Sequence, residues 1–265
     1  MNYKTDLVSI IMTTHNCEKI VKPTIRSIIN QTYQNWELII VDDFSSDNTV
    51  KICKKLLEGK INQTFQILRN EENKNVSFSR NQGIKQSQGR YLAFIDHDDI
   101  WLDQKIEKQI SFHKKNKVFL SHTYYRHFNK KSQIGHLIKS KDFLKYTDLL
   151  KLNSIALSSV MIDRDIENTF FFISEHEKKG SPQEDFRTWL SYSKKNHQLR
   201  IIKEDLMRYF YDQSTYSGNK FLMAKQRWHV LRNLEKISIL NASYFFIIYF
   251  FKSFNKYYFR KILNI

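Results

Sequence analysis

The sequence predicts an α/β fold in which helices flank a mainly parallel central sheet. Four strand-like runs, at residues 7–13, 36–41, 64–68 and 91–95, alternate with segments of helical apolar spacing through the first 120 residues. Such alternation is typical of crossover units that join parallel strands. The last run passes directly into three carboxylates, as expected for a buried strand whose carboxyl end opens onto a ligand crevice.

The composition predicts a large buried core. Hydrophobic residues make up 41% of the 265 positions, and the six glycines and two prolines form no linker. The two cysteines, Cys17 and Cys53, show no metal-ligand spacing, which predicts a reducing compartment. A strand-like run follows Asp6 directly, so we expect no secretory leader and a cytoplasmic protein.

The formal net charge of +16 predicts an anionic partner. Nucleic acid, a nucleotide or diphosphate substrate, and an acidic membrane surface all fit this charge. The sequence has no zinc-finger spacing, no ribonucleoprotein-type aromatic motif and no clear helix-turn-helix pattern. These absences argue against nucleic acid as the partner.

The first two strand-like runs end in polar turns. The first ends at Thr13, ahead of a segment with helical apolar spacing, and this turn offers backbone N–H groups to a ligand. The second ends in Asp42 and Asp43, where carboxylates can accept hydrogen bonds from a base or a ribose. Capping of the next helix explains Asp47, but Asp43 precedes the cap by several residues.

The segment at residues 75–83 opens a third helix. We expect this helix to end near Gln88 and Gly89, where glycine suits a left-handed C-cap. Arg80 lies early in the helix, where the helix dipole mildly disfavours a cation. Either an anionic partner explains Arg80 or it is a solvated surface arginine.

Asp96, Asp98 and Asp99 follow the strand at 91–95 within four positions. Their carboxylates repel one another unless a cation or a set of donors compensates them, which favours a hard divalent ion. The alternative is that Asp98, Asp99 or Asp103 only caps the helix that begins near Asp103.

Further elements follow in order. We expect an amphipathic helix at 103–115, a strand at 118–124, a variable loop with a short helix at 126–145, and a strand at 154–162. In residues 181–190, Pro182 precedes the acids Glu184 and Asp185. The start of a helix would by itself explain this order of residues. Ser214, Ser217 and Lys220 form either a lid or acceptor loop or the cap of the next helix.

The last 25 residues contain ten aromatic residues, four Lys or Arg and no acid. The apolar run at 244–251 is too short to span a bilayer. The segment therefore predicts a helical, amphipathic tail that lies on an anionic membrane surface. The alternative is a terminal helix that packs on its own domain or on a second subunit.

Four motifs occur in one order, within residues 9–16, 31–47, 80–83 and 94–101. Together they resemble the family 2 inverting glycosyltransferases of the GT-A fold, which have a Rossmann-like, mainly parallel sheet. The resemblance implies a sugar-nucleotide donor, usually a UDP-sugar, bound with Mn²⁺ or Mg²⁺.

The resemblance also implies roles for residues near the donor. Thr14 and Asn16 would line the nucleotide pocket, and Asp43 would face the uracil. Arg80 would lie near the diphosphate. Asp96 would face the ribose or metal, and Asp98 would bridge the metal. His97 replaces a residue that is more often small, and it either reaches the sugar or points away.

On the acceptor side, the resemblance makes Asp185 the catalytic base and Glu184 the neighbour that orients the acceptor or the base. Residues 1–205 would form the catalytic domain, and 206–265 the lid loop and membrane-associating helices. The implied protein is a peripheral enzyme of the cytoplasmic face of the inner membrane. It would transfer a hexose to a lipid-linked or lipid A-linked oligosaccharide during surface polysaccharide synthesis.

The donor expected from this resemblance is UDP-galactose, with UDP-glucose and UDP-N-acetylhexosamine as alternatives. Two other classes stay open at this point. A non-catalytic nucleotide-sugar binding protein would keep Asp43 and Asp98 without needing a base. A basic nucleic-acid binder would explain the charge without needing the acids.

Overall fold

The computed structural model describes residues 3–59, 61–167, 169–172, 183–212 and 219–262, and of residues 220 and 254–262 only the backbone. Within them lie ten strands: β1 (Lys4–Thr14), β2 (Trp36–Asp42), β3 (Phe65–Arg69), β4 (Gly89–Asp96), β5 (Ile100–Trp101), β6 (Leu120–Phe128), β7 (Ile134–Ile138), β8 (Phe143–Leu144), β9 (Met161–Asp163) and β10 (Leu199–Phe210). The α-helices are α1 (Val21–Ile29), α2 (Thr49–Leu57), α3 (Val76–Gln86), α4 (Lys105–Asn116), α5 (Tyr146–Lys151), α6 (Glu184–Lys194), α7 (Lys220–His229) and α8 (Ile239–Ile262). Two short helices, η1 (Leu157–Ser159) and η3 (Val230–Leu234), complete the described elements.

All the described strands belong to one sheet, in the order β3-β2-β1-β4-β9-β6-β10-β5, with β7 on β6 and β8 on β10. The four strands β1–β4 are parallel, and Thr13 of β1 pairs with Val41 of β2 and with Asp96 of β4. Their carboxyl ends therefore meet at one edge of the sheet. This arrangement confirms the α/β fold that the alternating pattern predicts.

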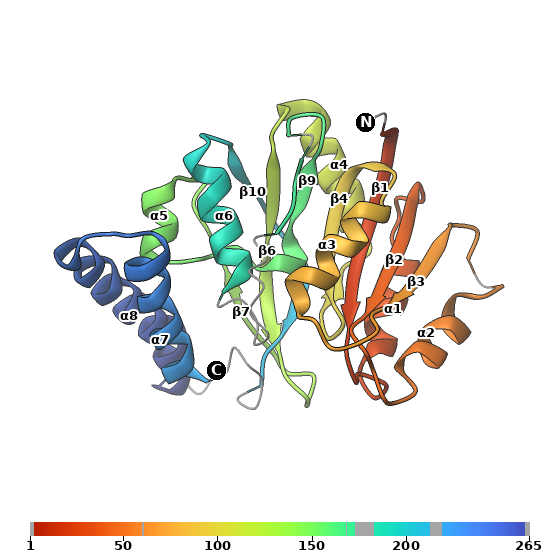
Figure 1. The fold of residues 1–265 in the computed structure, drawn as a ribbon, viewed down its shortest axis with the longest axis horizontal. Helices are drawn as coiled ribbons and strands as arrows, with labels where there is room; N and C mark the ends of the chain where they lie inside the picture. The colour runs from red at the N-terminus through yellow and green to blue at the C-terminus, as the bar shows by residue number, and fades with distance from the viewer. Residues whose placement is uncertain (1–2, 60, 168, 173–182, 213–218, 263–265) are drawn as a thin grey trace.

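Helices cover both faces of the sheet (Figure 1). Alternate residues of a strand point to opposite faces, so the central strands contribute to two cores. Ile10 of β1 and Ala93 of β4 belong to one core, which also contains residues of α1, α2 and α4. Ile11 of β1 and Phe94 of β4 belong to the other, which contains residues of α3, α6 and η3. Burial on both faces explains why β2 is buried along its whole length.

The second half of the sheet corrects one expectation. Residues 126–145 were expected to form a loop and a short helix, but β6 extends to Phe128 and is followed by β7 and β8. β6 pairs in parallel with β10 and antiparallel with β7. The expected strand at 154–162 is also shorter: η1 precedes β9, which pairs antiparallel with β4 and β6.

The expectation for Gly89 was also wrong, because this residue is not the left-handed C-cap of α3. Helix α3 ends before Ser87, whose backbone is extended, and Gly89 begins β4. A Cβ atom at Gly89 would lie 2.4 Å from the carbonyl oxygen of Leu7. Glycine is therefore required here by the close approach of two strands, not by its backbone angle.

Helices α5, α6, α7 and α8 lie together at one end of the molecule, opposite α1 and α2 (Figure 1). The tail is helical as predicted, and its Ala242 is fully buried in the core. Within the described residues, no helix combines the length and the apolar character needed to cross a membrane. The expected boundary between residues 205 and 206 falls inside β10, and the division into two domains stays a prediction.

We expect the substitution Gly89→Ala to destabilise the fold by about 1–3 kcal/mol, since the added methyl group forces β1 and β4 apart. Urea unfolding of the purified protein measures this cost. Lys85→Ala, at an exposed position of α3, serves as the control and should change the free energy of unfolding by less than about 0.5 kcal/mol. Equal stability of both variants would contradict the close approach.

Candidate active site

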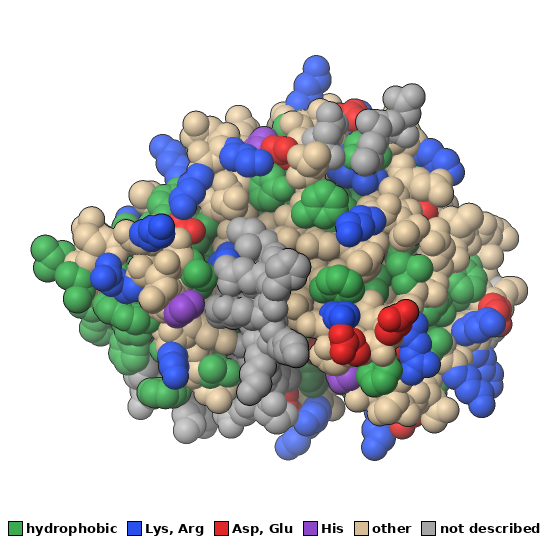
Figure 2. All heavy atoms as spheres, in the orientation of Figure 1, with side chains coloured by type: hydrophobic (Ala, Val, Ile, Leu, Met, Phe, Trp, Pro, Cys, Tyr) green, Lys and Arg blue, Asp and Glu red, His purple; other side chains and the backbone are tan. Residues whose placement is uncertain are grey.

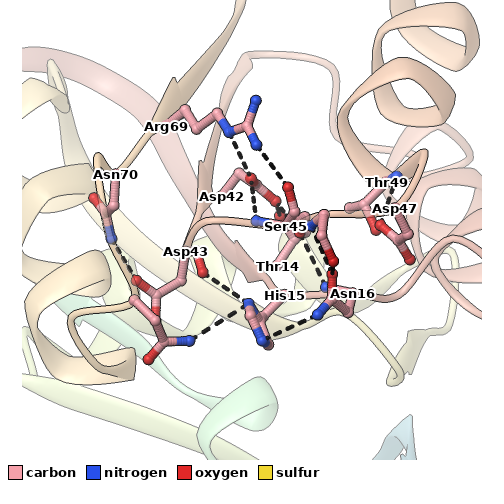
Figure 3. A network of polar contacts seen from close by, with 12 residues as sticks. Thr14, His15, Asn16, Asp42, Asp43, Ser45, Asp47, Thr49, Arg69 and Asn70 are labelled. Carbon is pink, nitrogen blue, oxygen red and sulfur yellow. Dashed lines mark hydrogen bonds and ion pairs between the residues drawn. The ribbon is translucent and has the colours of Figure 1, made fainter.

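The turn after β2 is held by a network of polar contacts (Figure 3). The Thr14 hydroxyl donates to Asp42 Oδ1 at 3.0 Å, and the Ser45 backbone N–H donates to Asp42 Oδ2 at 3.0 Å. Arg69 Nη2 donates to the Ser45 carbonyl at 2.6 Å. Asp47 was expected to be the N-cap of the next helix, but the N-cap of α2 is Asn48. Asp47 lies one residue earlier and accepts the N–H of Thr49 at 2.9 Å.

Asn16 and Asp43 lie in the same network (Figure 3). Asn16 Oδ1 accepts the Ser46 N–H at 2.9 Å. Asp43 is 7% exposed, and its Oδ1 accepts from Asn70 Nδ2 at 2.7 Å and from the Lys74 N–H at 2.9 Å. The structure thus brings Thr14, Asn16 and Asp43 together at the ends of β1 and β2. Their roles toward a nucleotide stay predictions.

The three acids after β4 have different surroundings. Asp96 Oδ1 forms an ion pair with Arg80 at 2.8 Å. Asp99 is 1% exposed, and it accepts the Phe210 N–H of β10 at 2.8 Å. Burial, followed by repulsion from Asp98, raises the pKa of Asp99 well above its usual range. The N-cap position of α4 is Gln104, so helix capping does not account for these acids.

Asp98 lies between these two and lines a cavity. Burial raises the pKa of Asp98 to about 6, and the charge of the nearby Asp96 adds to this effect. A carboxylate in such a place gains from a cation, because the cation replaces the solvation that burial removes.

Arg80 joins two elements that are far apart in the sequence. Its Nη2 contacts Asp96 at the end of β4, and its Nη1 contacts Glu184 Oε1 at the start of α6 at 2.9 Å. The residue is 5% exposed, so the alternative of a solvated surface arginine is wrong. Burial alone would lower the pKa of Arg80, but the Asp96 and Glu184 carboxylates outweigh it and raise this pKa.

The N-terminus of α6 presents the second pair of acids. Gln183 precedes the helix in a left-handed conformation, with φ of 50°. Asp185 Oδ1 accepts the Phe186 N–H at 2.6 Å, and Asn153 Nδ2 approaches Oδ2 at 3.4 Å. Burial and then repulsion from Glu184 raise the pKa of Asp185 to about 6. A pKa in this range suits a general base at neutral pH. Ser181 and Pro182 lie outside the described residues.

A cavity of about 470 Å³ connects the two acid pairs. Six of the predicted site residues line it: Arg80, Asp96, His97, Asp98, Glu184 and Asp185. The Nδ1 atom of His97 lies 3.3 Å from the Thr13 carbonyl oxygen, and a contact of His97 with the sugar stays a prediction. Thr14, Asn16 and Asp43 are not part of the cavity lining, although Thr13 is. The structure thus separates a cavity of acids from the polar network beside it.

The cavity has an aromatic side that sequence patterns did not reveal. Tyr125 and His127 of β6, with Tyr209 of β10 and Tyr211 just after it, all line the cavity. The rings of His127 and Tyr211 are stacked, with centroids 5.3 Å apart. Within each strand the two rings are two residues apart, so the sequence could have shown that they share a face. It could not show that β6 and β10 pair in parallel and bring the four rings together.

The C-terminal helices complete the lining with Met223 and Arg227 of α7 and Tyr249 and Ser253 of α8. Arg227 was also not predicted as a site residue. Ser214 and Ser217, the expected lid or acceptor residues, lie outside the described part of the chain. Lys220 begins α7, but its side chain is also outside the described residues.

Two of the cavity acids could act as ligands for a divalent cation. Among the described residues, no group of three or more His, Cys, Asp or Glu side chains is close enough to hold a metal ion. Asp98 and Asp96 nevertheless offer two carboxylates on the cavity wall. One or two carboxylates, completed by substrate phosphates and water, are typical of Mg²⁺ sites. The donor set therefore fits a cation that arrives with a phosphorylated ligand.

Comparison with known proteins identifies close relatives. The model of "Glycosyl transferase family 2" matches residues 9–171. Two proteins of Escherichia coli are similar over 85% or more of both chains: WfgD, 37% identical over 226 residues, and WfaP, 33% identical over 230 residues. Each is named a UDP-Glc:α-D-GlcNAc-diphosphoundecaprenol β-1,3-glucosyltransferase.

Solved structures show the same fold at lower identity. The crystal structure of TarS residues 1–349 from S. aureus, in complex with UDP-GlcNAc, matches with a TM-score of 0.68. The match covers 94% of this chain and 72% of that chain, at 15% sequence identity.

The bridge made by Arg80 generates a prediction. We expect Arg80→Met to lower the free energy of unfolding by about 3 kcal/mol, because it leaves two part-buried carboxylates without their cation. Denaturant unfolding measures the change, and Arg26→Met, at an exposed position of α1, is the control. If both variants were equally stable, the bridge would not hold β4 and α6 together.

Proposed function

This chain belongs to glycosyl transferase family 2, and we propose that it transfers glucose from UDP-glucose to a lipid-diphosphate-linked saccharide in bacterial surface polysaccharide synthesis. Its fold is the GT-A fold, and it is a glycosyltransferase. The observation that carries the proposal is the single cavity that joins the carboxylates after β4 to Asp185 at the start of α6.

The proposed donor differs from the galactose nucleotide expected from the sequence. Both Escherichia coli relatives are named for UDP-Glc and for an acceptor that carries GlcNAc on diphosphoundecaprenol. The similarity to them extends over 85% or more of both chains. These names support glucose over galactose as the transferred sugar.

In the proposed reaction, Asp185 removes the proton from the attacking hydroxyl of the acceptor saccharide. Its raised pKa, about 6, leaves it ionised at neutral pH and still basic enough to accept that proton. The hydroxyl oxygen attacks the anomeric carbon from the face opposite the leaving UDP, so the configuration inverts. Positioning of the two substrates supplies the remaining catalysis, and no covalent nucleophile is required.

On the donor side, Asp98 and Asp96 would hold Mn²⁺ or Mg²⁺ together with the diphosphate. Such a cation, when bound, neutralises the charge that develops on the leaving diphosphate. Arg80 keeps the Asp96 and Glu184 carboxylates at fixed positions on the two sides of the cavity. The network of Thr14, Asn16 and Asp43 would receive the uridine.

We also place the enzyme on the anionic cytoplasmic face of the inner membrane, through α8. On this helix Ala242 is buried, while Leu240, Tyr244, Ile247 and Phe251 are 53–81% exposed. Their spacing of three and four residues puts them on one face. Figure 2 shows hydrophobic side chains gathered over α8 at one end of the molecule. An apolar helix face on a protein of net charge +16 suits an anionic lipid surface.

A donor screen tests the transfer. With Mn²⁺ and a GlcNAc-diphosphate lipid acceptor, we expect UDP release from UDP-glucose at least tenfold faster than from UDP-galactose or UDP-GlcNAc. Anomeric analysis of the product should show a β linkage. A faster reaction with UDP-galactose would restore the original expectation for the donor, and no transfer from any UDP-sugar would reject the proposal.

The variant Asp185→Asn is the control for the base. It should keep its affinity for UDP-glucose but lose transfer by a factor of about 10² or more, since the amide cannot accept the proton. In the wild type, activity should fall as the pH drops through about 6, where Asp185 becomes protonated. Transfer by the variant at the wild-type rate would remove Asp185 from the mechanism.

Membrane attachment has its own measurement. Sedimentation with vesicles containing phosphatidylglycerol should recover the wild type, and the double substitution Ile247→Ser and Phe251→Ser should weaken binding about tenfold or more. Ile134→Ser, at an exposed position of β7, removes a similar side chain elsewhere and should have little effect. Equal loss in both variants would argue against α8 as the binding face.

A further inference from the structure

A buried guanidinium with no ion-pair partner among the described residues lines the cavity. Arg227 of α7 is 4% exposed and lies on the cavity wall. Within the described part of the chain, its Nε and Nη1 have no hydrogen-bond partner. A buried charge and buried N–H groups are costly unless something compensates them. Nε and Nη1 of Arg227 are therefore candidate donors for a ligand of this cavity.

The surroundings of Arg227 compensate its charge only in part. Its Cζ atom lies 3.5 Å from the centroid of the Phe186 ring and 4.7 Å from that of Tyr249. The Phe186 and Tyr249 ring faces attract the cation, and a hydrogen bond with the Tyr249 side chain and the charge of Asp185 also favour it. None of these contacts supplies an acceptor for Nε or Nη1. Arg80, on the same cavity, differs because two carboxylates accept its N–H groups. Burial lowers the pKa of Arg227 to about 10, so it stays charged at neutral pH.

The position of Arg227 indicates which anion it receives. Phe186, on which it stacks, directly follows Asp185. Helix α7 lies at the end of the molecule opposite α1 and α2, on the other side of β4 from the network of Thr14, Asn16 and Asp43 (Figure 1). The uridine side and Arg227 thus flank the acids of β4 from opposite directions.

We propose that Arg227 binds the diphosphate of the lipid-linked acceptor, an inference that rests on the proposed function. An arginine fork matches the oxygens of a phosphate group, and Nε and Nη1 of Arg227 have no acceptor among the described residues. Tyr249 and Ser253 of α8 line the cavity beside it. The acceptor's lipid chain leaves the cavity along α8, toward the exposed apolar face of that helix.

The test uses undecyl diphosphate, a probe that needs no donor and no transfer. Calorimetric titration of the full chain, in the presence of a chelator, should show binding that Arg227→Met weakens at least tenfold. Lys225→Met removes an exposed charge from the same helix and should leave the affinity within twofold. Unchanged affinity in Arg227→Met would overturn the proposal.

Kinetics distinguish the acceptor diphosphate from the donor diphosphate. Arg227→Met should raise the KM for the GlcNAc-diphosphate lipid at least tenfold and leave the KM for UDP-glucose within twofold. A raised KM for UDP-glucose with an unchanged acceptor KM would assign Arg227 to the donor instead. If the wild type binds undecyl diphosphate but transfers no sugar, the proposed function fails while the anion site stands.

Stability separates binding from a structural role. Because Arg227→Met removes an incompletely compensated buried charge, its melting temperature should equal or exceed that of the ligand-free wild type. If Arg227→Met does not fold, Arg227→Lys decides, since it keeps the charge and loses the fork. A folded Arg227→Lys with weakened probe binding supports the site, and one with unchanged binding overturns it.

Discussion

The two ion pairs of Arg80 are the constraint on which the active site depends. One guanidinium reaches Asp96, where the central strand β4 ends, and Glu184, where helix α6 begins. Helix α3 can present this side chain because it lies close against the sheet: a Cβ atom at Gly83, one turn after Arg80, would be 2.8 Å from Ile11 Cγ2. The Arg80 guanidinium therefore fixes the distance between Asp96, a proposed metal ligand, and Glu184, the neighbour of the proposed base.

Specific polar contacts also explain how three acids can follow one another after β4. The turn gives each of the three acids a different environment. Asp96 is paired with Arg80, and Asp99 is bonded to the backbone of β10 in the interior. Asp98 alone of the three has neither contact, and it lines the cavity beside Asp96. Burial and then repulsion from the neighbouring acids still raise the pKa values of Asp98 and Asp99, and a cation at Asp96 and Asp98 would reduce this repulsion.

The sequence predicted the parallel half of the sheet because strands buried on both faces have continuous apolar runs. It did not predict β7 and β8, which lie off the main strand order and carry few buried residues. Six of the residues that the family motifs singled out line one cavity, and their roles there stay predictions. Arg227 and the rings of β6 and β10 could not be predicted, because their places depend on how distant elements pack. Gly89 was misjudged for the same reason: its partner, Leu7, is remote in the sequence.

One side of helix α8 lines the cavity, and another side is exposed to solvent. Its Tyr249 and Ser253 line the cavity, while Leu240, Ile247 and Phe251 form an exposed hydrophobic surface on its outer side. Trimming the C-terminus to obtain better-behaved protein would therefore open the reaction chamber to bulk water. Solubility is better improved by polar replacements on the outward side of the helix, with the inward side kept as it is.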